Sequence, residues 1–239
     1  MASARATGRE QPASLSEAER IAARKREAAR SAAGEVRDGM RLGLGTGSTV
    51  AYLLQALGER VAELGELRCT ATSPATEQAA RALGLRVEDL DELGELDLAI
   101  DGADQVDRQG WLIKGGGAAH TREKIVASAA RRFVVIVSAE KVVERLTAPV
   151  PLELVPFAVQ TTLRALAPAE LRAVPPSPDG GLIADYLGAV ADPRELADKL
   201  SARPGVVEHG LFAPEMVSEI VIAGAAGVQR REGAKPDAS

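Results

Sequence analysis

One stretch of the sequence carries two aspartates, a lysine beside three glycines, and a glutamate, in that order. Asp101 and Asp104 belong to an Asp-Gly-Ala-Asp turn, and Lys114 directly precedes residues 115–117, which are all glycine. Three consecutive glycines carry a large ordering cost and typically let the backbone approach a ligand. A lysine beside them suits an oxyanion, and the carboxylate of Glu123 can act as a general base. Together these residue types predict proton-transfer chemistry.

Each part of this stretch also has an ordinary structural interpretation. Asp-Gly turns are common between strands and helices. A glutamate in the first turn of a helix, as expected for Glu123, complements the helix dipole. The order of the parts therefore supports a functional site more strongly than any one of them.

A second glycine-rich segment, residues 43–49, lies between a predicted strand and a predicted helix. Free backbone N–H groups at such a helix start favour a phosphate, and Ser48 and Thr49 add hydroxyl donors. A dinucleotide fingerprint does not fit, because the third glycine position is Ser48 or Val50 according to register. A Walker loop is also excluded, because no lysine follows the glycines at the required spacing. The alternative is a tight turn whose glycines serve only close packing.

Elements that must position these residues alternate between strand and helix. Strands are expected at 40–44, 67–72, 96–100 and 133–137, with helices at 16–36, 49–64, 74–83 and 122–130. Ser16 and Glu19 predict a capping box at the first helix. This alternation predicts an α/β fold, a Rossmann-like, helix-flanked, mostly parallel sheet. Asp101 then lies at the carboxyl edge of that sheet, where such folds bind ligands.

The composition changes after Leu146, where prolines cluster. A helix at 157–166, a strand at 182–186, a helix at 193–200 and a strand at 206–212 predict a smaller α+β domain, and a strand at 218–223 returns to the first sheet. We therefore expect a catalytic domain of residues 16–147 plus 214–232, a small domain of residues 148–213, and disordered tails at 1–15 and 233–239.

Charge and composition exclude several classes of function. The chain has 239 residues, a net charge of -5, two histidines and one cysteine. No basic cluster favours nucleic acid, and His and Cys are too few for a zinc centre, so no metal is expected. No apolar run could span a bilayer and no signal peptide is recognisable, which predicts a cytoplasmic protein. The strand that follows the glycine-rich segment 43–49 ends in Thr70-Ala71-Thr72-Ser73. It lacks the acidic residue that binds the ribose in a nicotinamide site, which disfavours a nicotinamide cofactor.

The sequence resembles the ribose-5-phosphate isomerases of the A type over nearly the whole chain after the first twenty or so residues. The segments that carry the resemblance are 45–49, 101–104, 114–126, 151–157 and 204–212. It implies interconversion of ribose 5-phosphate and ribulose 5-phosphate through an enediolate, in the non-oxidative pentose phosphate pathway. No cofactor is needed, and the partner is a small sugar phosphate.

The resemblance also implies roles for individual residues. Glu123 would carry the proton between C1 and C2, and Lys114 would support the oxyanion. Asp101 and Asp104 would bind sugar hydroxyls, and Asp101 could assist ring opening. The other residues expected to contact substrate in this region are Gly102, Ala103, Gly115, Gly116 and Gly117.

The phosphate would bind at Thr46, Gly47, Ser48 and Thr49, together with a lysine. Lys141 is that lysine by alignment, and Lys25 is a second candidate. Near Lys141 the sequence departs from the family, which usually has an aspartate and a serine where this chain has Ser138 and Glu140.

Three other classes of protein fit the sequence less well. A sugar-phosphate sensor would need a DNA-binding module, and the residues before the first strand are too few for a helix-turn-helix. A nicotinamide-dependent dehydrogenase lacks the glycine register, and an acyl-CoA transferase would use the glutamate as a covalent thioester. His120 and His209 are expected to be structural. The resemblance implies a homodimer or homotetramer.

Overall fold

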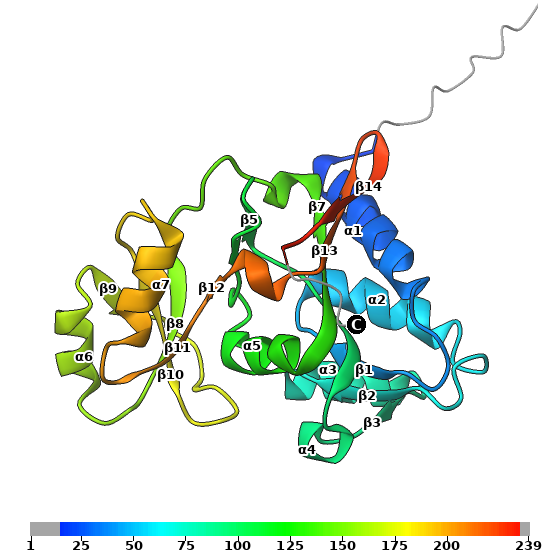
Figure 1. The fold of residues 1–239 in the computed structure, drawn as a ribbon, viewed down its shortest axis with the longest axis horizontal. Coiled ribbons are helices and arrows are strands. Elements are labelled where there is room, and N and C mark those ends of the chain that lie inside the picture. The colour runs from blue at the N-terminus through cyan, green and yellow to red at the C-terminus, as the bar shows by residue number, and fades with distance from the viewer. Residues whose placement is uncertain (1–14, 235–239) are drawn as a thin grey trace, which may run out of the picture.

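The computed structural model describes residues 15–234, which form a large sheet with helices on both faces and a smaller sheet beside it (Figure 1). Of the predicted tails at 1–15 and 233–239, residues 1–14 and 235–239 lie outside the described residues. Gly233, expected in the C-terminal tail, donates its N–H to the carbonyl of Ser218 at 2.8 Å.

The large sheet has seven strands, parallel except for an antiparallel edge hairpin. In spatial order they are β14 (Gly227–Glu232), β13 (Glu219–Gly224), β7 (Ala130–Ser138), β4 (Leu96–Asp101), β1 (Arg41–Leu44), β2 (Arg68–Ala71) and β3 (Arg86–Val87). The mostly parallel α/β fold is confirmed. The edge hairpin strand β14 was missed because its polar side chains carry no apolar pattern.

Helices cover both faces of this sheet. One face carries α1 (Glu17–Ala33), α2 (Ser48–Gly58) and α3 (Pro74–Ala82), and the other carries α5 (His120–Ala129); the short helix α4 (Leu90–Leu93) leads into β4. In β7, Val134 and Ile136 join one core while Phe133, Val135 and Val137 join the other. This explains the unbroken apolar run, because both faces of the strand are covered.

The predicted capping box is present at α1. Ser16 Oγ accepts from Glu19 N at 3.3 Å, and Ser16 N donates to Glu19 Oε2 at 2.8 Å. Helix α2 ends at Gly58, so the expectation of a helix to residue 64 is wrong. After Gly58 the chain continues in turns, and Leu64 is still buried there. The apolar residues therefore keep a helix-like spacing although the segment is not a helix.

The smaller sheet has four antiparallel strands. Their order is β11 (Val206–His209), β8 (Val150–Leu154), β10 (Leu182–Tyr186) and β9 (Ala169–Leu171), with α6 (Val159–Ala165) and α7 (Pro193–Ser201) beside them. Strand β8 lies in the proline-rich segment, where the sequence alone did not indicate a strand because proline disfavours central strands.

A three-stranded sheet connects the two parts. It consists of β12 (Leu211–Phe212), β6 (Leu112–Ile113) and β5 (Gln105–Val106), and two 3-10 turns complete the fold at Ala139–Lys141 and Pro214–Met216. The single strand expected at 206–212 is wrong, because the chain changes sheets at Gly210. A Cβ atom at Gly210 would lie 2.2 Å from the carbonyl oxygen of Lys114, so only glycine fits this crossing.

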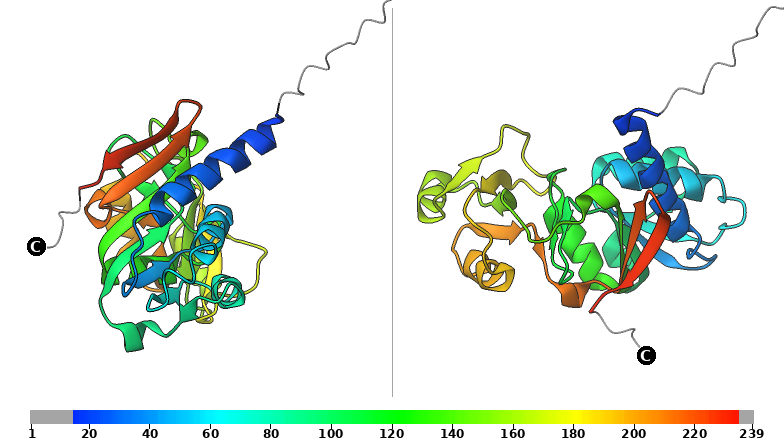
Figure 2. Two further views of the ribbon diagram at one scale, coloured as in Figure 1. Left: turned by 90° about the vertical axis from the view of Figure 1, so that its right-hand side faces the viewer. Right: turned by 90° about the horizontal axis from the view of Figure 1, so that it is seen from above.

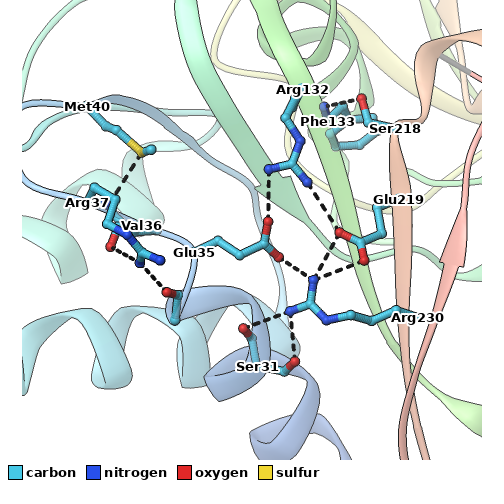
Figure 3. Close-up of polar contacts among 11 residues, drawn as sticks. Ser31, Glu35, Val36, Arg37, Met40, Arg132, Phe133, Ser218, Glu219 and Arg230 are labelled. Atoms are coloured by element: carbon cyan, nitrogen blue, oxygen red, sulfur yellow. Dashed lines mark hydrogen bonds and ion pairs between the residues drawn. The ribbon is translucent and has the colours of Figure 1, made fainter. Parts of the chain in front are cut away.

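Figure 2 shows α1 lying alongside the β13–β14 hairpin. A network of two arginines and two glutamates joins them (Figure 3). Arg230 donates to Glu35 at 2.6 Å and to Glu219 at 3.0 Å, and Arg132 donates to the same two carboxylates at 2.9 and 3.3 Å. Arg230 also bonds the carbonyl and hydroxyl of Ser31 at 3.0 Å. The network fastens the end of α1 to the sheet.

Among residues 15–234, each helix is too short or too polar to cross a membrane.

Candidate active site

A cavity of about 110 Å³ opens at the carboxyl edge of the parallel sheet. Its walls come from α1, the β1–α2 turn, the loop after β4, the glycine run, the first turn of α5 and the 3-10 turn after β7. The lining residues are Lys25, Thr46, Gly47, Ser48, Thr49, Val50, Gly102, Ala103, Asp104, Lys114, Gly115, Gly116, Gly117, Glu123 and Lys141. The structure therefore brings together all the predicted site residues except Asp101, which lies just beneath.

At the floor of the cavity, one lysine stands between two carboxylates. Lys114 Nζ is 2.9 Å from Asp101 Oδ2 and 3.1 Å from Glu123 Oε2, and it donates to the carbonyl of Gly102 at 2.5 Å. All three side chains are at most 5% exposed. Glu123 Oε2 has no hydrogen-bond partner among the described residues, so its contact with Lys114 is an ion pair.

Burial and charge shift the acidity of all three groups. Burial, followed by the nearby charge of Asp101, raises the pKa of Glu123 to about 8, although Lys114 opposes this shift. Burial raises the pKa of Asp101 too, against the attraction of Lys114. For Lys114, burial alone lowers the pKa, but the two carboxylates outweigh it and the pKa is raised. A desolvated carboxylate whose pKa is near neutrality suits a general base.

Asp101 makes its contacts with the protein. Its Oδ1 accepts from the N–H groups of Thr46 at 3.1 Å and Gly102 at 2.7 Å, while Oδ2 faces Lys114. Gly45 packs directly on it, since a Cβ atom there would lie 1.9 Å from Asp101 Cγ. Asp101 thus orients Lys114 and joins the β1–α2 turn to the end of β4.

The three consecutive glycines at 115–117, the glycine run, adopt a backbone conformation that requires glycine. Gly115 has φ +102°, and a Cβ atom there would lie 2.7 Å from His120 Nδ1. Gly116 donates its N–H to Asp104 Oδ2 at 2.8 Å. The backbone of Gly116 and the carboxylate of Asp104 therefore line the cavity next to each other.

At the opposite end of the cavity, α2 begins at Ser48. Lys25 Nζ donates to Ser48 Oγ at 2.9 Å, and Lys141 lines the same cavity. The hydroxyl of Thr46 turns away, toward those of Thr72 at 2.7 Å and Ser73 at 2.8 Å. The helix start and two lysines make this end suitable for an anion.

Glu140, the unusual acid beside Lys141, is bound to other residues. Its Oε1 accepts from the hydroxyl of Ser138 at 2.5 Å, and its Oε2 is 3.5 Å from Arg24. Both departures from the family pattern therefore contact each other, and Arg24 balances the added charge.

Neither histidine lines the cavity. His120 is fully buried, and neither of its ring nitrogens has a hydrogen-bond partner in the described part of the chain. His209 contacts Ser201 Oγ at 3.0 Å and accepts from Leu211 N at 3.2 Å. Within the described residues, no group of three or more His, Cys, Asp or Glu is arranged to hold a metal ion.

Two residues that position the site were missed by sequence reasoning. Gly210 accepts from Lys114 N at 2.9 Å and donates to Pro151 O at 2.7 Å, and Arg172 bonds the glycine run. Both are distant from the site in sequence. No local sequence pattern distinguished Arg172 from the other arginines of the chain.

A Rossmann-like sheet with a lysine and two buried carboxylates at its carboxyl edge defines an enzyme of the sugar-phosphate isomerase class. The chain belongs to the family of ribose 5-phosphate isomerase A (phosphoriboisomerase A), which matches residues 68–227.

The sequences of known relatives align with most of this chain. Ribose-5-phosphate isomerase A of Rhodopseudomonas palustris (strain TIE-1) is 45% identical, over 88% of this chain and 97% of the relative. That of Methanosarcina acetivorans is 46% identical, over 83% and 89%. A solved D-ribose-5-phosphate isomerase in complex with phospho-erythronic acid superposes with a TM-score of 0.84 at 34% identity, over 89% of this chain and 99% of that one.

Proposed function

We propose that this chain interconverts D-ribose 5-phosphate and D-ribulose 5-phosphate through an enediolate, as a step of the non-oxidative pentose phosphate pathway. The observation that carries the proposal is the buried pair of Glu123 and Lys114, 3.1 Å apart, in a cavity with an anion-binding end. The names of the relatives and the sugar-acid phosphate bound to a similar structure support it.

In the proposed reaction, Glu123 removes the proton from C2 of the open-chain aldose. Electrons move into the C1 carbonyl, and the resulting enediolate is stabilised by the ammonium of Lys114. Glu123 then returns the proton to C1 as the C2 oxygen becomes the carbonyl, while the proton of the C2 hydroxyl moves to the C1 oxygen and leaves a hydroxyl there. The oxidation at C2 balances the reduction at C1, so the step consumes no external oxidant or reductant.

The polar groups along the cavity match those of a sugar phosphate. We place the phosphate at the start of α2, from Thr46 to Thr49, with Lys141 and Lys25, and the sugar hydroxyls at Asp104 and the glycine run. The contacts of Asp101 with Lys114 and two backbone N–H groups favour a supporting role during ring opening as well as binding.

We also propose the two-domain division at residues 148–213 and a homo-oligomer, a dimer or tetramer. Apolar side chains on the small domain support an interface there, with Phe157 86% exposed. A cytoplasmic location suits the single, buried Cys69. A net charge of -5 favours no nucleic-acid partner.

Purified protein is expected to convert ribose 5-phosphate to ribulose 5-phosphate in the presence of a chelator. Glu123→Gln keeps the shape of the side chain but not the base, so kcat should fall by about 10³-fold or more while substrate still binds. Glu88→Gln, directly after the edge strand β3 and outside the cavity lining, is the matched control. Full activity of Glu123→Gln would refute the assignment of the base, and an inactive wild-type protein would refute the function.

A further inference from the structure

A chain of hydrogen bonds crosses one peptide group of the glycine run. Arg172 Nη1 donates to the carbonyl of Gly115 at 2.9 Å, and the N–H of Gly116 donates to Asp104 Oδ2 at 2.8 Å. The carbonyl of Gly115 and the N–H of Gly116 belong to the same peptide. Arg172 therefore acts on one side of the peptide whose other side holds Asp104, a cavity wall residue.

Arg172 is itself fixed by the small sheet. Its Nε and Nη2 donate to the two carboxylate oxygens of Asp185 at 2.9 and 2.5 Å, and its backbone N–H bonds Ile183 O at 2.9 Å. A bidentate carboxylate orients the planar guanidinium, which leaves Nη1 aimed at the glycine run. Lysine could not reproduce this geometry.

The glycine run needs such support. Gly115 adopts φ +102°, and glycine loses more freedom on ordering than other residues. Arg172 Nη1 also lies 3.3 Å from the carbonyl of Gly116, so it holds two successive peptides. A cation on the carbonyl side makes the N–H on the other side a stronger donor, because linked hydrogen bonds polarise one another.

We propose that Arg172, held by Asp185, is a positioning residue for the sugar end of the site: it orients the peptide between Gly115 and Gly116 and, through it, Asp104. This inference rests on the proposed function. Arg172 does not line the cavity, so it acts without contacting substrate. The small domain thereby contributes to substrate recognition from behind the wall of the site.

The test measures kcat, KM and competitive inhibition by inorganic phosphate in Arg172→Met and Asp185→Asn. Losing charge-assisted bonds to the run should raise KM for ribose 5-phosphate about tenfold or more in Arg172→Met, and less in Asp185→Asn. The inhibition constant of phosphate should stay within about twofold, because its binding end is built from other elements. Arg194→Met, which removes another small-domain arginine ion-paired with a carboxylate, should match wild type.

A double-mutant cycle tests whether Arg172 acts through Asp104. In an Asp104→Ala background, Arg172→Met should raise KM much less than in wild type, because the group that it orients is gone. Thermal unfolding of each variant checks that the assayed protein is folded. Unchanged KM in folded Arg172→Met, an equal rise in the phosphate constant, or additive effects in the cycle would each overturn the inference. A wild-type protein without isomerase activity would instead overturn the proposed function.

Discussion

At the scale of single residues, the site depends on an imbalance of charge. Asp101 and Glu123 share Lys114 in a buried space, so one carboxylate is held less tightly than the other. Asp101 has two backbone donors in addition to the lysine, whereas Glu123 Oε2 has no aligned donor among residues 15–234. Because bonds from N–H groups stabilise the charged form, Glu123 is the better proton acceptor.

The activity of the wild-type enzyme should rise with pH as Glu123 loses its proton, with the acid limb of kcat/KM near its pKa of about 8. Asp101→Asn keeps the acceptor for Thr46 and Gly102 but removes a negative charge. The limb should therefore move to lower pH by roughly one unit, whatever the loss of rate. A pH–rate series with Asp97→Asn as control measures this, and an unmoved or raised limb would contradict the charge coupling.

At the scale of elements, three separate segments form the end of the cavity at which we place the phosphate. Helix α2 contributes its start, α1 contributes Lys25, and the 3-10 turn after β7 contributes Lys141. Helix α1 is fastened at its far end by the arginine–glutamate network of Figure 3, which keeps Lys25 over Ser48. The two lysines therefore approach the same space from independent supports.

Lys141→Ala and Lys25→Ala should each mainly raise KM, because they remove binding that is equal in the ground state and the transition state. A lost charged contact predicts a rise of about tenfold, with kcat changed by less than about threefold. Steady-state kinetics with Lys199→Ala, on α7, as control measures the effect. A loss confined to kcat would show that the lysine acts on the chemical step instead.

At the scale of the whole molecule, α5 is the element on which the two sheets meet. Around Glu123, three neighbours bond the four-stranded sheet and its loops: Thr121 contacts Glu153, Arg122 binds Asp179 at 2.7 Å, and Lys124 binds Glu208 at 2.6 Å. Buried polar groups concentrate at this junction, including both histidines. Its stability should therefore depend on pH.

Burial is the largest cause that lowers the pKa of His120 and of His209, to about 4 in each case. Since an unfolded histidine titrates near 6.5, the unfolded chain binds more protons between about pH 6.5 and 4, so stability should fall as pH falls through that window. His120→Leu removes one such group, whose ring nitrogens have no hydrogen-bond partner of good geometry among residues 15–234. In this variant the free energy of unfolding should fall less steeply with decreasing pH, by roughly 1 kcal/mol per pH unit. The variant should also be more stable than wild type by about 1 kcal/mol at pH 7.

Urea unfolding at several pH values measures both effects. His209→Leu is the matched control, because His209 accepts from Leu211 N and contacts Ser201, so its loss should destabilise the protein at pH 7. A destabilised His120→Leu at neutral pH, or one with the wild-type slope, would show that His120 has a partner that stabilises it.

Local patterns predicted the alternation of strands and helices, the capping box at Ser16 and the order of the chemical groups from Asp101 to Glu123. Those features depend on neighbours in sequence, through side-chain periodicity, hydroxyl caps and glycine turns. The same reasoning missed β8 among its prolines and extended α2 past Gly58, because there packing against distant segments outweighs local preference.

The roles that sequence could not reveal depend on contacts between distant segments. The sequence determined which groups the site contains, whereas the tertiary structure decided that Asp101 faces Lys114 and that Thr46 turns its hydroxyl toward Thr72. It also decided that Gly210 carries the chain between sheets and that Arg172 reaches the glycine run. The physical reason is that burial, charge pairing and crossing of sheets arise only when strands far apart in sequence pack together.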